Sequence, residues 1–248
     1  MRQSRPEVRF LTEAECEAAV RLAGQYGDLI TVAVGTGLRF GEITALWVSD
    51  VDLTRRTIRV SKAWKREGEA GAHDTPTWLS KSLTAKHAMR EHYLGNPKTA
   101  KSRRTISISV SVAAALARQR AGKASDDFVF TSRHGRPLHN GDFHTHVWRK
   151  LMKALTAEGI APFRFHDLRH THVACLVAGG APLPHIQARL GHESITTTID
   201  TYGHLLPSGD ELISGIIDTA LGGGIIRPGT YDGSVAFLRA VQHNWVSE

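Results

Sequence analysis

Apolar residues recur at helical spacing along most of the chain, and glycines mark the breaks between segments. Thr12 and Glu15 form a capping-box pair, and the apolar stripe after them predicts a first helix. The next apolar segment, LITVAVGTGLRFGEITAL, is interrupted at Gly35 and Gly37. It predicts two helices joined by a tight turn that presents Arg39.

Later segments continue the helical pattern. Residues 110–120 are rich in alanine and predict a helix. Four further helices are predicted in THVWRKLMKALTAEG, FHDLRHTHVACLVAGG, LPHIQARLG and SITTTIDTYGHLL. A Gly-Gly pair ends the second of these, Gly191 ends the third, and Tyr202 lies near the end of the fourth.

Alternating polar and apolar residues predict a few short strands. The segment VDLTRRTIRVSKAW alternates through Ile58 and Val60, and RRTISIS near residue 105 has the same pattern. A further short strand and turn are predicted in FVFTSRHGRPLHNGDF. The polar stretch from Lys65 to Gly95 predicts a long connection with at most a short helix. The fold class expected from these patterns is mainly α with a small antiparallel β-sheet.

Composition narrows the class of protein. With 248 residues, of which 41% are hydrophobic, the chain is long enough to bury a core and is neither disordered nor fibrous. Thirty-one Lys and Arg against 24 Asp and Glu give a formal charge of +7, which favours a polyanionic partner. The apolar runs are too short for a membrane span, and the polar start lacks a signal-peptide core. We therefore expect a cytoplasmic protein without membrane contact.

Cysteines and tryptophans favour a structural interpretation. Cys16 and Cys175 have no metal-ligand spacing and lie in apolar segments, so we expect buried free thiols of a reducing compartment. A disulfide framework is excluded. Trp47 and Trp148 sit in apolar helical patterns, which favour the core over a base-stacking platform.

The charge is unevenly distributed along the chain. Residues 1–206 contain 29 basic and 19 acidic side chains, whereas residues 207–248 contain two basic and five acidic ones. The basic surface is therefore expected in the first part, because an acidic tail is poorly suited to a phosphate backbone. The run Gly222–Gly224 predicts a hinge in this tail. We expect residues 207–248 to dock on protein, for instance on a neighbouring protomer.

Four motifs, each ordinary alone, suggest one chemistry in combination. Two arginines can present planar forks of donors to one phosphodiester and neutralise charge that grows in a five-coordinate transition state. Histidines can donate hydrogen bonds or move a proton, a lysine can protonate a departing alkoxide, and a tyrosine can be the nucleophile. The motifs are TGLRFGE with Arg39, PKTAKSRRT with Lys98, HDLRH with His166 and Arg169, and LGHESITTTIDTYGH with His192 and Tyr202.

These motifs, in this order, resemble the catalytic domain of the tyrosine recombinase family of the phage-integrase type, from about Leu11 to Leu206. The resemblance implies the catalytic-domain fold of that family and site-specific cleavage and rejoining of double-stranded DNA. It implies a homo-oligomer on DNA, a tetramer on two duplexes, and no need for ATP, a cofactor or a metal. The roles that it implies are a phosphate clamp from Arg39 and Arg169, general acid catalysis by Lys98, proton transfer by His166, a phosphate hydrogen bond from His192, and a 3′-phosphotyrosyl link at Tyr202 that frees a 5′-hydroxyl.

Two features depart from the family pattern. Family members generally carry an additional DNA-gripping domain before the catalytic one, whereas here the first catalytic helix follows Thr12. We therefore expect this chain alone to bind its DNA site weakly. The interval from Val60 to Lys98 is also longer than the strand connection of the family. Lys101 and Lys86 are the alternative candidates for the general acid.

Several neighbouring residues have two interpretations. Lys101, Arg103 and Arg104 form an acid-free basic run, which is typical of an exposed turn and a candidate DNA contact. Glu42 either orients Arg39 or is an ordinary helix-start acid.

Three more residues flank the predicted site. Asp167 is either the partner of a catalytic group or a helix-start acid. His170, like His172, is expected to pack or hydrogen-bond beside the site. His204 either contacts the phosphate or caps a helix.

Three rival functions remain open at this point. A metal hydrolase is suggested by His166 and His170, four apart on one helix face, but Asp167 replaces the glutamate of a zinc-protease helix and Arg169 adds a cation. A non-catalytic DNA-binding module leaves Tyr202 unexplained. A type IB topoisomerase-like enzyme uses similar residues to relax DNA without exchanging strands.

Overall fold

The computed structural model describes residues 8–66, 92–95, 102–192 and 194–203. Short 3-10 turns cover Gly24–Tyr26 and Val48–Asp50, and a π-helical segment, His144–Trp148, leads into α7. The described α-helices are α1 (Glu13–Leu22), α2 (Gly27–Thr36), α3 (Phe40–Ile43), α5 (Val110–Arg120), α6 (Asn140–Phe143), α7 (Arg149–Ala157), α8 (Phe165–Ala178), α9 (Leu183–Leu190) and α10 (Ile195–Tyr202). The predicted mainly helical class is confirmed.

Two small antiparallel sheets accompany the helices. The first has the order β1-β2-β5, with Ile58 paired to Val51 on one side and to Ile106 on the other. The second pairs β3 with β4. The strands are β1 (Val51–Asp52), β2 (Thr57–Val60), β3 (Ala63–Arg66), β4 (His92–Gly95) and β5 (Arg104–Ser107). The stretch predicted as a connection therefore begins and ends in paired strands.

Local signals set the first helices as predicted, with one exception. The Thr12 hydroxyl accepts the Glu15 N–H at 3.2 Å, and the Glu15 carboxylate accepts the Thr12 N–H at 2.8 Å, which completes the capping box. Gly37 ends α2 at φ 66°, where a side chain would strike His172. Gly35 was predicted as a break, but it lies inside α2. A Cβ there would collide with Val112, so this glycine permits close packing of α2 on α5.

The main core surrounds α2. Leu29, Ile30 and Val32 of this helix are fully buried, and α2 packs against α1, α5 and α8. Burial of each such side chain contributes about 1.5–3 kcal/mol. Trp47 and Trp148 are 6% and 3% exposed, which confirms their predicted place in the interior.

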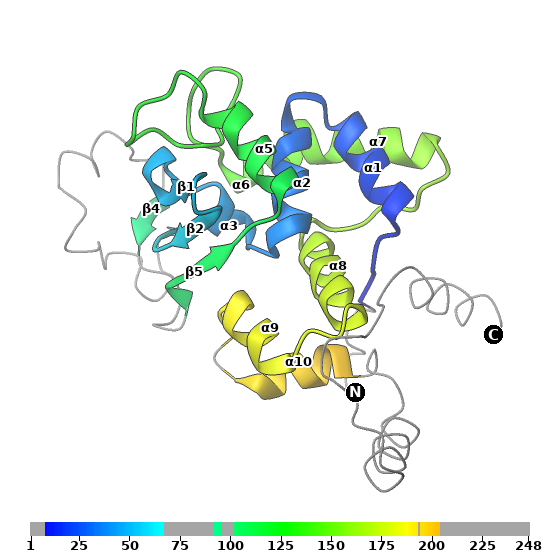
Figure 1. Cartoon of the computed structure of the whole chain (residues 1–248). Helices are drawn as coiled ribbons and strands as arrows, with labels where there is room; N and C mark the ends of the chain where they lie inside the picture. The colour runs from blue at the N-terminus through cyan, green and yellow to red at the C-terminus, as the bar shows by residue number, and fades with distance from the viewer. Residues whose placement is uncertain (1–7, 67–91, 96–101, 193, 204–248) are drawn as a thin grey trace, which may run out of the picture.

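A separate apolar cluster joins the last three helices. Figure 1 shows α9 and α10 at one end of the molecule, with α8 running from the body towards them. The ring of Tyr202 is part of this cluster and is 2% exposed. Its apolar neighbours are Val173, Val177, Ile186 and Leu190. The packing of α10 on α8 and α9 therefore fixes where the tyrosine lies.

The cysteines differ from the expectation. Both are free thiols, but Cys175 is exposed on α8 and Cys16 is only half-buried, so the prediction that both are buried is wrong. Burial nevertheless raises the pKa of Cys16 to about 12, and this thiol stays protonated. Within the described ranges, no helix is both long and apolar enough to cross a membrane. The acidic tail, residues 207–248, lies outside the described residues.

Candidate active site

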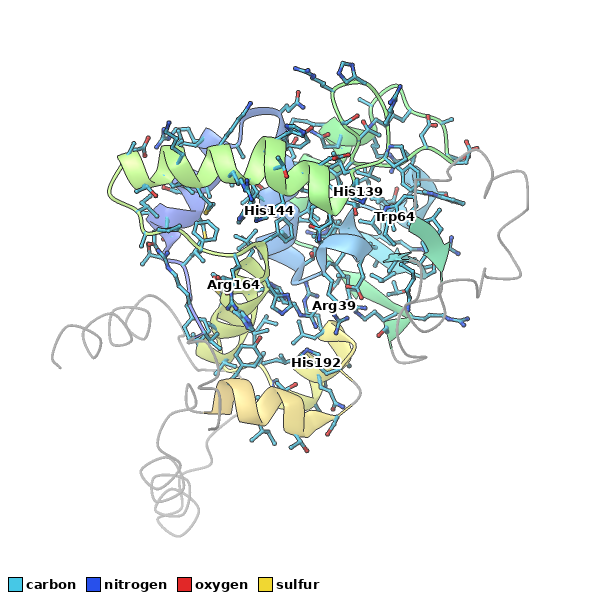
Figure 2. The ribbon with its side chains drawn as sticks, turned by 180° about the vertical axis from the view of Figure 1, so that it is seen from behind. Arg39, Trp64, His139, His144, Arg164 and His192 are labelled. Carbon is cyan, nitrogen blue, oxygen red and sulfur yellow. The ribbon has the colours of Figure 1, made fainter. Side chains whose placement is uncertain are left out.

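Four places in the fold contribute the predicted functional side chains. Arg39 precedes α3, His166 and Arg169 lie on α8, His192 follows α9, and Tyr202 ends α10. Their charges act on one another: Arg39 and Arg169 both lower the pKa of His166 and of His192. In Figure 2, Arg39 and His192 lie close together between the upper body and the α9–α10 end. Arg169 also acts on the phenol of Tyr202. The structure thus brings Arg39, His166, Arg169, His192 and Tyr202 into one region.

Glu42 holds Arg39 in place. Its carboxylate accepts the Arg39 backbone N–H at 3.0 Å and pairs with Arg39 Nη1 at 3.1 Å. Burial alone would raise the pKa of Glu42, but the positive charges and hydrogen bonds of Arg104 and Arg39 outweigh it and hold this pKa below its usual value. Glu42 is therefore an anion, and it orients a guanidinium that remains 41% exposed.

The start of α8 repeats this arrangement. The Asp167 carboxylate accepts the Arg164 backbone N–H at 2.7 Å and pairs with Arg164 Nη2 at 2.7 Å. Phe40 and Phe165 meet edge to face, with ring centroids 5.0 Å apart, so the two helix starts pack together. Asp167 therefore binds Arg164 and caps its helix, as the second interpretation proposed. The repeated pattern Arg-Phe-x-acid at 39–42 and 164–167 was the signal for Arg164, which sequence reasoning missed.

Arg169 is the buried guanidinium of the site, 2% exposed. Its Nη1 donates to the Gly37 carbonyl at 2.5 Å, and its Nη2 donates to the Leu190 carbonyl at 2.9 Å. Burial and the charge of Arg39 lower the pKa of Arg169 to about 9. This value is still well above neutral, so Arg169 stays cationic and ties α2 and α9 together.

His192 follows Gly191, which closes α9 at φ 64°. Its Nε2 lies 2.9 Å from Arg169 Nη2 and must accept, because a guanidinium only donates. The ring proton is therefore on Nδ1, which donates to Thr198 Oγ1 at 2.9 Å. Burial and the charges of Arg169 and Arg39 lower the pKa of His192 to about 4, so this imidazole is neutral at pH 7.

His166 lies at the surface in the first turn of α8, where it stands edge to face with His170, ring centroids 4.8 Å apart. Desolvation by the surrounding side chains, together with repulsion from His170 and Arg169, lowers the pKa of His166 to about 4. A bound phosphate would raise the pKa of both His166 and His192, because its negative charge favours the protonated ring.

The Tyr202 hydroxyl meets His170 rather than His166. The distance from the hydroxyl oxygen to His170 Nδ1 is 2.6 Å. Burial raises the pKa of Tyr202 to about 12 even though Arg169 acts to lower it, and burial lowers the pKa of His170. A neutral phenol and a neutral imidazole therefore share one hydrogen bond.

The remaining predicted residues fall into two groups. Lys98, Lys101, Lys86 and His204 lie outside the described residues. Arg103 is exposed, as expected for a basic turn. Arg104 is not: its side chain is 7% exposed and pairs with Glu42. This position favours an internal ion pair over the predicted DNA contact.

The described residues contain no group of three or more His, Cys, Asp and Glu side chains placed to hold a metal ion. The metal-hydrolase interpretation needed His166 and His170 as ligands. His170 Nδ1 is instead occupied by Tyr202. The charge around Arg169 also favours an anion, since Arg39, Arg104 and Arg169 outnumber the Glu42 carboxylate among them. A phosphate group is one of the anions that guanidinium forks fit.

Comparison with known proteins identifies relatives. A family model described as the phage integrase family matches residues 8–208. The ICEBs1 integrase of Bacillus subtilis (strain 168) is 29% identical over 233 residues, which are 88% of this chain and 56% of the relative. A XerC-like tyrosine recombinase of Caldanaerobacter subterraneus subsp. tengcongensis is 28% identical over 193 residues, 72% of this chain and 45% of the relative. The chain thus spans about half the length of these relatives.

Solved structures share the fold. The Tn1549 transposon integrase in complex with transposon right end DNA superposes with a TM-score of 0.68 at 23% identity, covering 89% of this chain and 69% of that one. The XerA recombinase superposes with a TM-score of 0.54 at 20% identity, covering 88% and 66%. The expected catalytic-domain fold is confirmed.

Proposed function

Because the chain belongs to the phage integrase family, we propose that it is the catalytic part of a site-specific DNA recombinase that cleaves and rejoins double-stranded DNA. One observation carries the proposal. The guanidiniums of Arg39 and Arg169 act on the same two histidines, and Arg169 also acts on the phenol of Tyr202. Arg169 Nη2 lies 2.9 Å from His192 Nε2, and the Tyr202 hydroxyl lies 2.6 Å from His170 on the helix that carries Arg169. These contacts support a nucleophile, proton carriers and a cationic phosphate site in one place.

In the proposed reaction, the Tyr202 oxygen attacks the phosphorus of a DNA phosphodiester and forms a 3′-phosphotyrosyl ester. The bond from phosphorus to the 5′-oxygen breaks, and Lys98 gives this oxygen a proton, so a 5′-hydroxyl leaves. The phenol proton passes to an imidazole. His166 serves in this transfer by family resemblance, and His170 is a second candidate because its Nδ1 lies 2.6 Å from the phenol oxygen. Attack by a new 5′-hydroxyl reverses the step, so resealing needs no ATP.

The two arginines are assigned to the transition state. As the phosphorus becomes five-coordinate, negative charge grows on its non-bridging oxygens, and guanidiniums already fixed in place stabilise that charge without rearranging. Glu42 fixes Arg39, and the Gly37 and Leu190 carbonyls fix Arg169. His192 adds a hydrogen bond to the same phosphate. To donate from Nε2, His192 gives up the Arg169 contact and takes up a proton at Nε2, which the negative charge of a bound phosphate favours.

A covalent adduct tests the proposal. A nicked suicide DNA duplex, incubated with the protein in the presence of a chelator, should trap the protein on DNA through Tyr202. A non-catalytic DNA-binding module forms no adduct. A type IB topoisomerase-like enzyme forms one but relaxes supercoiled plasmid without joining strands of two duplexes. Strand exchange between two labelled duplexes therefore separates the recombinase from the topoisomerase.

We further propose an assembly role for the acidic tail. Residues 1–206 form the DNA-cleaving domain, and residues 207–248 dock on a neighbouring protomer in a tetramer on two duplexes. The excess of acidic side chains in the tail supports docking on protein, because negative charge is repelled by the phosphates of DNA. Deletion of residues 222–248 should weaken cooperative binding to paired sites and spare cleavage at a single site. Unchanged cooperativity in a band-shift titration would remove this role.

A further inference from the structure

Arg104, at the start of β5, shares a carboxylate with Arg39. Its Nη1 and Nη2 contact the two Glu42 oxygens at 3.2 and 3.1 Å. The same two oxygens hold the Arg39 guanidinium and its backbone N–H at 3.1 and 3.0 Å. Glu42 therefore stands between an exposed guanidinium and a buried one, since the side chains of Arg39 and Arg104 are 41% and 7% exposed.

The other side of Arg104 reaches the turn that carries His192. Its Nε donates to the Arg189 carbonyl at 2.6 Å, and its Nη1 donates to the Ser102 carbonyl at 2.8 Å. A Cβ at Gly191 would stand 3.0 Å from Arg104 Nη1, so the guanidinium lies directly against this turn. One buried side chain thus touches the supports of Arg39 and of His192.

We propose that Arg104 is a positioning residue of the active site, which holds Glu42 against Arg39 and the Gly191 turn beneath His192, and that it does not contact DNA. This inference rests on the proposed recombinase function. It replaces the sequence-based assignment of Arg104 to the DNA-binding surface.

Guanidinium geometry explains why an arginine is needed here. Its planar fork presents five N–H donors, and this structure uses donors on Nε, Nη1 and Nη2 for the Glu42 carboxylate and the carbonyls of Ser102 and Arg189. A lysine at this position keeps the charge but has one donor centre, so it cannot span both Glu42 oxygens and the Arg189 carbonyl. If Arg104 is lost, Glu42 keeps Arg39 as its other ion-pair partner, and the charge that Arg39 offers a phosphate is diminished.

The test compares Arg104→Lys with Arg103→Lys and Arg103→Gln, in which the exposed neighbouring arginine is changed. For each protein we would measure single-turnover cleavage of the suicide duplex at saturating DNA, the dependence of DNA affinity on salt, and urea unfolding under the assay conditions. We expect Arg104→Lys to cleave about 10²-fold more slowly, a loss of the size seen when one transition-state donor is removed. Its Kd and its salt dependence should match the wild type.

Arg103→Gln provides the contrasting result. Loss of a residue that contacts phosphate lowers the magnitude of the slope of log K against log salt by about 0.9 and leaves the saturated cleavage rate unchanged. Arg104→Met, the second variant, removes the charge as well as the fork and is the match for Arg103→Gln. If Arg104→Met behaves in that way, or if the saturated rate of Arg104→Lys equals the wild-type rate, the positioning role is wrong. Urea unfolding shows which variants are folded under the assay conditions. Single-turnover cleavage rates are compared among the folded variants.

The proposed function is judged separately, on the wild type alone. If wild-type protein forms no adduct, the recombinase proposal fails, and the contacts of Arg104 are then tested without DNA. Amide hydrogen exchange at residues 189–192 should speed up at least 10-fold in Arg104→Lys but not in Arg103→Lys, because only Arg104 holds the Arg189 carbonyl. Equal exchange in both variants would mean that Arg104 does not hold the turn.

Discussion

The hydroxyl of Tyr202 lies 2.6 Å from Nδ1 of His170, although 32 positions separate the two residues along the chain. Replacing His170 by Ala removes the imidazole that can take the phenol proton. Transfer of a proton to a placed base contributes about 10²–10⁴-fold to rate, so cleavage of the suicide duplex should slow by about 10²-fold or more while the Kd for DNA stays unchanged. The measurement is single-turnover adduct formation at saturating DNA.

The matched control for this change is His146→Ala, which alters an exposed histidine of the π-helical segment. It should leave adduct formation at the wild-type rate. Loss of His170 also removes the hydrogen-bond partner of the buried Tyr202 hydroxyl, which should lower the free energy of unfolding by about 1–3 kcal/mol. An undiminished cleavage rate in His170→Ala would show that the contact with Tyr202 has no part in the chemistry.

Replacing Tyr202 by Phe removes only the hydroxyl. The ring remains in its apolar cluster with Val173 and Leu190, so folding and DNA binding should be close to those of the wild type. The covalent adduct should disappear entirely, because phenylalanine has no nucleophile. Denaturing gel electrophoresis of the trapped product checks this outcome, and an adduct yield equal to the wild type would assign the nucleophile elsewhere.

Arg39 offers the cleanest test of the phosphate clamp. It is partly exposed, whereas Arg169 also supports the Gly37 and Leu190 carbonyls and its loss would disturb the fold. Arg39→Lys keeps a positive charge but not the planar fork. Cleavage should fall by about 10²–10³-fold and DNA affinity by much less, since the fork acts on charge that develops in the transition state. Equal losses in rate and in affinity would contradict the clamp.

His172 should make the fold sensitive to acid. It accepts a hydrogen bond from Arg189 Nε at 2.9 Å and donates one to the Val34 carbonyl, and burial and the charge of Arg189 lower its pKa from 6.5 to about 3. Between these values the unfolded chain binds the proton and the folded chain does not, so stability is full above pH 6.5 and is lost as the pH falls. From about pH 8 to pH 5 the loss is about 2 kcal/mol, because it accumulates at 1.36 kcal/mol per pH unit below the pKa of the unfolded chain.

Urea titrations followed by tryptophan fluorescence measure this effect. The wild type should lose about 2 kcal/mol more than His172→Gln over the same interval, because glutamine does not titrate. His146→Gln, at the surface, should behave as the wild type does. Parallel losses in all three proteins would assign the acid sensitivity to other groups.

Local features of the molecule were predictable from sequence. The capping box of Thr12 and Glu15 and the left-handed turn at Gly191 depend on neighbouring residues only, and both appear as predicted. The segment that carries Arg39 was also placed correctly after the glycine turn, because Gly37 ends α2 through its own backbone conformation.

Features that depend on distant contacts were not predictable. Arg104 lies in an exposed-looking basic run, and its burial follows from Glu42, 62 positions earlier. Strand β4 pairs with β3, and a long interval of polar residues separates the two strands along the chain. No alternation of polar and apolar residues near β4 predicts this pairing. The prediction of a helix break at Gly35 was wrong for the same reason. This glycine lies inside α2 because a side chain there would collide with Val112 of α5.

Glu42 gives the cluster of guanidiniums a permanent counter-ion. Arginines gathered without one would repel each other more strongly. The carboxylate is built into α3 and is 3% exposed, so it stays among the arginines whether or not a phosphate is bound. The guanidiniums are therefore held from within the protein, while the cluster keeps the surplus positive charge that attracts a phosphate.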